Sequence, residues 1–197
     1  MINEKFVYVG AIISISFGMS YVIATLKGKT KPNRVSWFLW FLAPMIAFAS
    51  QLKQGVGAQA VLTFTAGFNP LLVFIASFIS RKAQWKITQL DIVCGVLSLL
   101  GIVFWLLADA PNVAILFSIL ADAMAAVPTV IKSYKEPETE NGTVFLGGMI
   151  SAFITLLTIH SWEFKNYAFS AYIFSICVLL FSLITLRPHY KSKKQQV

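Results

Sequence analysis

Residues 110–131 read APNVAILFSILADAMAAVPTVI, an apolar stretch that contains a single carboxylate, Asp122. A helix that crosses a bilayer needs roughly 20 predominantly apolar residues, and this stretch has that length. Asp122 lies about ten residues along it, roughly 15 Å at 1.5 Å per residue, which is the depth of the membrane midplane. An ionisable group at that depth is costly unless a partner or a water-filled cavity receives it. The stretch therefore predicts a polar site inside a bundle of membrane helices.

The rest of the chain has the composition of a membrane protein. Of its 197 residues 57% are hydrophobic and 12% are charged, and the mean hydropathy is +0.74. Soluble domains average about 25% charged residues. Six further apolar stretches approach the length of a span, and only short turns separate them. We predict an all-α integral membrane protein with seven transmembrane helices, at residues 6–26, 35–52, 54–80, 87–108, 110–131, 143–162 and 167–186.

The basic residues set the expected orientation. When the turns are assigned alternately to two sides, 13 of the 16 lysines and arginines fall on one side and three on the other. The positive-inside rule then places the N-terminus outside and the C-terminus in the cytoplasm, with the protein in the plasma (inner) membrane. Cytoplasmic turns and a short tail account for the net charge of +8. We therefore expect the lipid bilayer as a partner and no nucleic acid.

Two polar connections on the predicted cytoplasmic side are alike, residues 27–34 and 132–142. Each contains a proline and carries an asparagine shortly before the next apolar stretch, and a shift of 108 positions aligns Asn33 with Asn141. Because both connections lie on one side, the two halves form a parallel repeat, an architecture of transporters that bind solute near the midplane. We predict a 3+1+3 arrangement: a three-helix repeat at 1–86, a connector helix at 87–108, a second three-helix repeat at 109–186 and a basic cytoplasmic tail at 187–197.

In this layout the chain resembles the PQ-loop and SWEET-like (MtN3-like) membrane proteins. Pro128-Thr129 stand where the second Pro-Gln pair of that family falls, whereas the 108-residue shift puts Ser20-Tyr21, without a proline, at the first pair. Tyr21 is then the counterpart of Thr129, and we place Tyr21 at the solute and Thr129 in a hinge. The resemblance implies a carrier that moves a small polar solute, such as a sugar or an amino acid, by alternating access. Homo-oligomers also occur among SWEET-like proteins.

The resemblance adds weight to two residues at membrane depth. Asp122 is similar in placement to the acidic residue in the fifth helix of proton-coupled amino-acid exporters of this clan. It is therefore a candidate to bind solute or carry a proton, or else to lock two helices together. Asn69, directly before Pro70, reaches a similar depth and is similar to the pocket asparagine of SWEET-like carriers. Its amide suits a small solute, or else it bonds the backbone carbonyl that Pro70 frees.

The second predicted helix supplies the other site candidates. Trp40 lies roughly 10 Å from its cytoplasmic end, and its indole N–H needs a partner, so it forms a pocket wall or simply packs. Trp37, nearer the end, is interpreted as an interfacial anchor. Pro44 in this helix and Pro128 in the fifth are candidate hinges at matching depth, or tolerated kinks.

The remaining acidic residues are expected near the membrane surface. Thr88 and Asp91 have the spacing of a capping box, which predicts that Asp91 caps the fourth helix. Glu136, Glu138 and Glu140 are expected in a solvated cytoplasmic loop, with pairing to the first connection as an alternative.

Several classes of function are disfavoured. The chain has no Cys/His cluster with metal-ligand spacing and no glycine-rich phosphate loop, so we expect no metal, no cofactor and no enzymatic activity. The last apolar stretch has no lysine for a retinal Schiff base. The alternative from another class is a non-transporting receptor or scaffold with the same fold.

Overall fold

The computed structural model describes residues 2–53, 59–80, 82, 85–107 and 111–187. Over these residues the chain forms seven α-helices and no β-strand, which confirms the all-α prediction and the number of helices. Residues 188–197 of the predicted tail lie outside the described part. The helices are α1 (Phe6–Leu26), α2 (Arg34–Lys53), α3 (Gln59–Ile79), α4 (Gln89–Leu107), α5 (Pro111–Lys135), α6 (Thr143–Leu157) and α7 (Phe164–Phe181), with a 3₁₀ turn η1 (Pro137–Thr139) before α6 and a π-helical end η2 (Ser182–Leu186) after α7.

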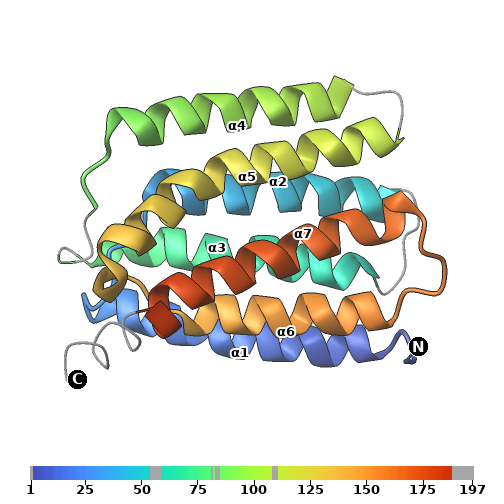
Figure 1. The fold of residues 1–197 in the computed structure, drawn as a ribbon, viewed down its shortest axis with the longest axis horizontal. Coiled ribbons are helices and arrows are strands. Elements are labelled where there is room, and N and C mark those ends of the chain that lie inside the picture. The colour runs from blue at the N-terminus through green and yellow to red at the C-terminus, as the bar shows by residue number, and fades with distance from the viewer. Residues whose placement is uncertain (1, 54–58, 81, 83–84, 108–110, 188–197) are drawn as a thin grey trace.

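The helices run lengthwise in one bundle, with α4 along one edge and α1 and α6 along the other (Figure 1). In the first half of the chain, α3 packs against both α1 and α2; in the second half, α7 packs against both α5 and α6. The halves meet where α1 packs against α6 and α2 packs against α5. α4 lies on α5 and, less extensively, on α2. Six helices therefore surround the interior, and α4 covers it from outside.

Five helices are long and apolar enough to cross a bilayer, and two are shorter. Spanning segments occupy α1, α3, α4, α5 and the continuous stretch from α7 through η2, whereas the apolar parts of the other two are Arg34–Ala49 in α2 and all of α6. α6 has 15 residues, about 22 Å, against a hydrocarbon core of roughly 30 Å. The apolar helices of spanning length indicate a membrane protein.

The predicted end of the sixth helix at residue 162 is wrong. The helix ends at Leu157, and Thr158 is its C-terminal cap. The hydroxyl of Thr158 donates to the carbonyl of Thr155 at 2.7 Å. Ile159 and Trp162 lie beyond this cap, so they extended the hydropathy signal without extending the helix.

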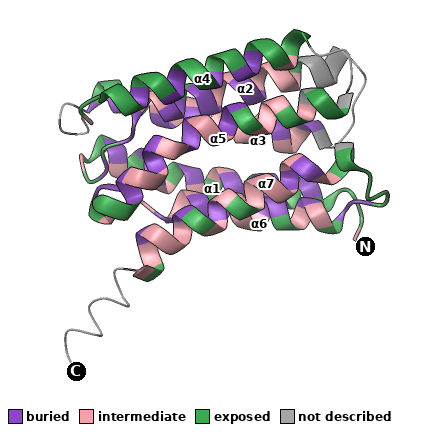
Figure 2. Ribbon diagram, turned by 45° about the horizontal axis from the view of Figure 1, so that its top comes forward, coloured by how far each residue is buried: buried purple, intermediate pink, exposed green. Residues whose placement is uncertain are grey.

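Large apolar side chains lie on the outer surface of the bundle, most of all on α4, whose outer side is exposed (green in Figure 2). A soluble protein rarely exposes an apolar patch of this extent, and lipid accepts one without penalty. The exposed large apolar side chains of α4 are Leu90, Ile92, Val93, Val96, Leu97, Leu99, Leu100, Val103, Phe104, Leu106 and Leu107.

The inner side of α4 is held closely against α5. A Cβ atom added to Gly101 would lie 2.9 Å from the Cβ of Ala121, so the two backbones approach closely only because a glycine stands there. The hydroxyl of Ser98 donates to the carbonyl of Ala121 at 2.7 Å. These contacts fix the α5 backbone directly beside Asp122.

Polar caps order the end of the bundle that carries residues 27–33 and 136–142, here called the basic end. The predicted capping box is confirmed: the Asp91 carboxylate accepts the Thr88 N–H at 2.5 Å, and the Asp91 N–H lies 3.4 Å from the Thr88 hydroxyl. Asp91 also accepts the side-chain amide of Asn33 at 2.6 Å. This unforeseen contact ties α4 to the connection between α1 and α2.

Candidate functional site

A cavity of about 110 Å³ lies inside the bundle and is lined by α1, α2, α3, α5, α6 and α7. Most of its wall is apolar. The polar or polar-tipped lining residues are Ser14, Trp37, Trp40, Thr65, Asn69, Asp122, Ser151 and Cys177. Among the described residues, no three His, Cys, Asp or Glu side chains come together. The chemistry of the cavity is therefore that of one carboxylate, one amide, hydroxyls and indoles.

Asp122 is buried in this cavity, with 7% of its surface exposed. The hydroxyl of Tyr172 on α7 donates to its carboxylate at 2.6 Å. Trp40 on α2 is its other polar neighbour, but the indole nitrogen does not reach hydrogen-bonding geometry. The carboxylate is thus held by one neutral donor, and one of its two oxygens is left for another partner.

Asn69 faces the cavity from α3 with its amide held in one orientation. Its side-chain nitrogen donates to the carbonyl of Ser14 at 3.0 Å and to the hydroxyl of Ser14 at 3.1 Å. The interpretation in which this amide bonds the carbonyl freed by Pro70 is therefore wrong, because α1 supplies both acceptors. The amide oxygen, Oδ1, is buried and has no partner among the described residues. Because Ser14 fixes the amide nitrogen, Asn69 presents its oxygen, a hydrogen-bond acceptor, to the cavity.

Gly18 makes this position of Asn69 possible. A Cβ atom at Gly18 would lie 2.6 Å from the Cγ atom of Asn69, a distance that non-bonded carbons do not adopt. A larger residue on this turn of α1 would displace the amide.

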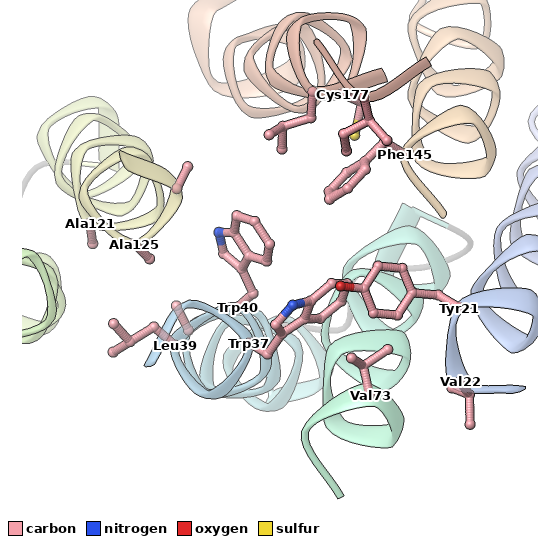
Figure 3. Packing of buried hydrophobic residues seen from close by; sticks show 14 of the residues in the cluster. Tyr21, Val22, Trp37, Leu39, Trp40, Val73, Ala121, Ala125, Phe145 and Cys177 are labelled. Atoms are coloured by element: carbon pink, nitrogen blue, oxygen red, sulfur yellow. The ribbon is translucent and has the colours of Figure 1, made fainter. Parts of the chain in front are cut away.

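Three aromatic rings form one wall of the cavity. The ring centroids of Trp37 and Trp40 lie 5.4 Å apart, and those of Trp40 and Phe145 lie 6.3 Å apart, both edge to face. In Figure 3 the Trp40 ring reaches from α2 into the space between the helices, with Phe145 across from it. Both indole nitrogens are buried without a partner in the described structure. Trp37 is only 2% exposed, so its interpretation as a lipid-facing anchor is wrong.

A buried ion pair lies at the basic end of the bundle. The ammonium nitrogen of Lys132 lies 2.6 Å from a carboxylate oxygen of Glu140, and both side chains are fully buried. Tyr21 donates its hydroxyl to the other Glu140 oxygen, and Lys132 also donates to the carbonyl of Lys31. The Lys132 nitrogen lies 4.8 Å from the centroid of the Trp85 ring. We call Tyr21, Lys31, Lys132 and Glu140 the basic-end clamp.

The expectation of a solvated loop is therefore wrong for Glu140, although Glu136 and Glu138 are exposed. A charge is stable inside a protein when an opposite charge and hydrogen bonds satisfy it. The clamp gives Glu140 both. Its members come from separate segments that meet only in the fold.

The structure brings together four of the predicted site residues. Asp122, Asn69, Trp40 and Pro44 all line the cavity. Three others lie elsewhere: Tyr21 belongs to the clamp, and Pro128 and Thr129 follow on α5 beyond the lining. Thr129 is fully buried, and its hydroxyl has no partner in the described part of the chain.

Sequence reasoning missed the polar partners of its two principal candidates. Tyr172, which bonds Asp122, and Ser14, which orients Asn69, were not singled out. One signal for Ser14 was available in the sequence. The 108-residue shift aligns Ser14 in the first half with Asp122 in the second. Tyr172 offered no such signal, since its counterpart, Phe64, has no polar group.

Comparisons of the chain with protein-family models, curated proteins and solved structures find no match. The cavity and the arrangement of the helices around it are therefore the features that bear on function.

Proposed function

We propose that this protein is a membrane carrier that moves a small polar solute by alternating access, as the resemblance to SWEET-like proteins implies. The observation that carries the proposal is the interior cavity, where a buried carboxylate and an unpartnered amide oxygen face the same space. Buried polar groups without protein partners are expensive, and a bound solute satisfies them. In this account Asp122, Asn69 and Trp40 contact the solute.

The proposed carrier consists of two parallel three-helix repeats, residues 1–86 and 109–186, joined by a connector helix at 87–108. The helix neighbours support this arrangement. In each half the third helix lies against both others, and the contact of α1 with α6 has its counterpart in that of α5 with α2. Such paired contacts are those expected of two repeats related by a two-fold axis along the bundle, and helices of both halves line the cavity.

The 108-residue shift supports the same arrangement at the level of residues. Asn33 accepts the N–H of Val35 at 3.1 Å, and Asn141 accepts the N–H of Thr143 at 2.9 Å, so each asparagine side chain bonds the backbone N–H two residues ahead, at the start of the next helix. The shift also pairs lining residues across the cavity: Ser14 with Asp122, Trp37 with Phe145, Trp40 with Gly148, Thr65 with Ile173, and Asn69 with Cys177.

The basic-end clamp supplies a gate for alternating access. Tyr21 and Lys31 belong to the first repeat, whereas Lys132 and Glu140 belong to the second. The clamp therefore joins the two halves and closes the end that the positive-inside rule assigns to the cytoplasm. Opening on that side requires the contacts of Tyr21 and Lys31 with the second repeat to break. Pro44 and Pro128 weaken the helix backbone where the halves bend.

Asp122 is the proposed proton carrier where transport is coupled to protons. The titratable groups that face it come from α7: Tyr172, which bonds it, and Cys177. From α2 it meets Trp40, which does not titrate. A carboxylate with one neutral donor and an open side can release and accept a proton as the cavity changes the side to which it opens.

The test is a solute-uptake screen with the purified protein in proteoliposomes, with and without a pH gradient. Saturable uptake of at least one small solute, together with exchange of internal for external solute, is expected. No uptake of sugars, amino acids, amines or vitamins by folded protein would contradict the carrier and favour a receptor or scaffold. We also propose, from the positive-inside rule, that the N-terminus lies outside and the C-terminus in the cytoplasm, with the protein in the plasma (inner) membrane.

A further inference from the structure

We propose that the cavity selects a small protonated amine, an inference that rests on the carrier function proposed above. Asp122 is the one charged side chain among the described residues that line the cavity, and no lysine, arginine or histidine faces it there. Tyr172 gives the carboxylate a hydrogen bond and no positive charge. A buried carboxylate is stabilised most by an opposite charge that also donates hydrogen bonds, and a primary ammonium does both.

The amide of Asn69 favours the same solute. Its nitrogen is committed to Ser14, so only its oxygen is presented to the cavity. An oxygen acceptor suits an N–H donor. Asp122 and Asn69 thus offer acceptors from α5 and α3 to a group that has several N–H bonds.

The aromatic wall is the third feature that fits a cation. Trp37, Trp40 and Phe145 have centroids between 5.4 and 6.4 Å apart and line one cavity. Aromatic faces attract an ammonium group, and the attraction is larger where water is excluded. An anion meets the negative faces of these rings and the Asp122 charge together, so the wall also disfavours anionic solutes.

The other unpartnered polar groups of the cavity, together with its volume, indicate what the solute carries besides its ammonium group. The indole nitrogens of Trp37 and Trp40 and the hydroxyl of Ser151 are buried without partners in the described structure. These donors suit an oxygen carried by the same solute. A cavity of about 110 Å³ has room for roughly seven to eleven water-sized groups, since one water needs roughly 10–15 Å³ by this measure. The site therefore fits a short amine with a hydroxyl group.

Four probes of nearly equal size separate the charge classes: 2-hydroxyethylammonium, ethylene glycol, glycine and glycolate. Binding to the full-length protein in lipid nanodiscs is measured at pH 7 by calorimetry, which avoids leakage of the free amine through a bilayer. We expect the cation to bind at least about tenfold more tightly than the neutral, zwitterionic and anionic probes. Tighter binding of any of those three probes would overturn the proposal.

Two matched variants test whether 2-hydroxyethylammonium binds at Asp122. Asp122→Asn removes the cavity charge and should weaken binding of 2-hydroxyethylammonium about tenfold or more. Glu138→Gln removes one charge from the exposed loop and should leave it unchanged. If Asp122→Asn does not fold, the double variant Ser14→Asp/Asp122→Ser moves the carboxylate to the paired position on α1. The double variant should still prefer the cation over ethylene glycol, and loss of that preference would contradict the proposal.

The failures of the two proposals are distinguishable. Uptake of a neutral or anionic solute, with no binding of the ammonium probe, would overturn the amine selectivity and leave the carrier standing. Binding of the ammonium probe without uptake or exchange of it would support the site and overturn transport.

Discussion

The hydroxyl of Tyr172 lies 2.6 Å from the carboxylate of Asp122 and joins α7 to α5 at the wall of the cavity. In the proposed carrier, movement of α7 would act through this bond on the one acidic group among the described residues that line the cavity. Asp122 is buried, and this donor is its one hydrogen-bond partner by geometry within the described structure. The proposed transport cycle would use this bond to couple helix movement to the charge of the site.

Removal of the Tyr172 hydroxyl should destabilise the protein and alter transport. Tyr172→Phe leaves Asp122 without its donor, and hydrogen bonds to charged groups contribute about 1.5–3 kcal/mol. We expect a lower midpoint of thermal unfolding, measured by tryptophan fluorescence, and a changed pH profile of solute uptake. Tyr167→Phe removes a tyrosine hydroxyl from the same helix and leaves the bond between Tyr172 and Asp122 in place, so it is the control. An unaltered pH profile in Tyr172→Phe would show that the bond has no part in coupling.

The buried pair of Lys132 and Glu140 should show strong energetic coupling. Removing one member leaves the other buried and unpaired, which costs about 3–5 kcal/mol. Lys132→Met and Glu140→Leu should each be severely destabilising, and the double variant should be closer to wild type than the sum of the two. A double-mutant cycle on thermal unfolding measures this coupling.

The exposed Glu136 provides the control for that cycle. Glu136→Leu combined with Lys132→Met should give additive effects, because the two side chains do not form the pair. Additivity for Lys132 and Glu140 as well would contradict the clamp.

Crowding at Gly18 should disturb the site more than crowding elsewhere on α1. Gly18→Ala places a Cβ atom 2.6 Å from the Cγ atom of Asn69, whereas Gly10→Ala places one 3.2 Å from the Ser151 hydroxyl. We expect Gly18→Ala to raise the solute KM several-fold, because the Asn69 oxygen is displaced. The effects are measured by initial rates of uptake. Equal effects of the two variants would show that Asn69 does not bind the solute.

The orientation in the membrane can be measured with single cysteines. Cys94 and Cys177 are buried, so the native thiols should react slowly. Lys5 and Lys135 are exposed near opposite ends of the bundle. In intact cells, Lys5→Cys should react with a membrane-impermeant maleimide, and Lys135→Cys should react only after the membrane is opened. The reverse pattern would invert the proposed topology.

The helices were largely predictable because apolar stretches of spanning length alternate with short polar turns. The end of α6 was not, because the apolar Ile159 and Trp162 follow its C-terminal cap at Thr158. A hydropathy average over a window does not resolve where within it the helix ends. The five spanning segments were therefore easier to predict than the two shorter apolar helices.

The site was predictable only where a residue is unusual by itself. A carboxylate at the midplane is rare enough to identify Asp122, and the amide of Asn69 stands out in the same way. Tyr172 does not, because its role depends on the rotation of α7, which packing decides. Lys132 looked like an ordinary basic residue at a helix end, and its burial follows only from how two connections distant in sequence meet.

Proton-driven uptake by wild type, Asp122→Asn and Glu138→Gln proteoliposomes is the most direct test of the central claim, that the cavity around Asp122 is the transport site. With the solute found in the screen, wild type and Glu138→Gln should accumulate it in response to a pH gradient. Asp122→Asn, shown to be folded, should lose that accumulation. Equal gradient-driven accumulation by all three proteins would contradict the claim.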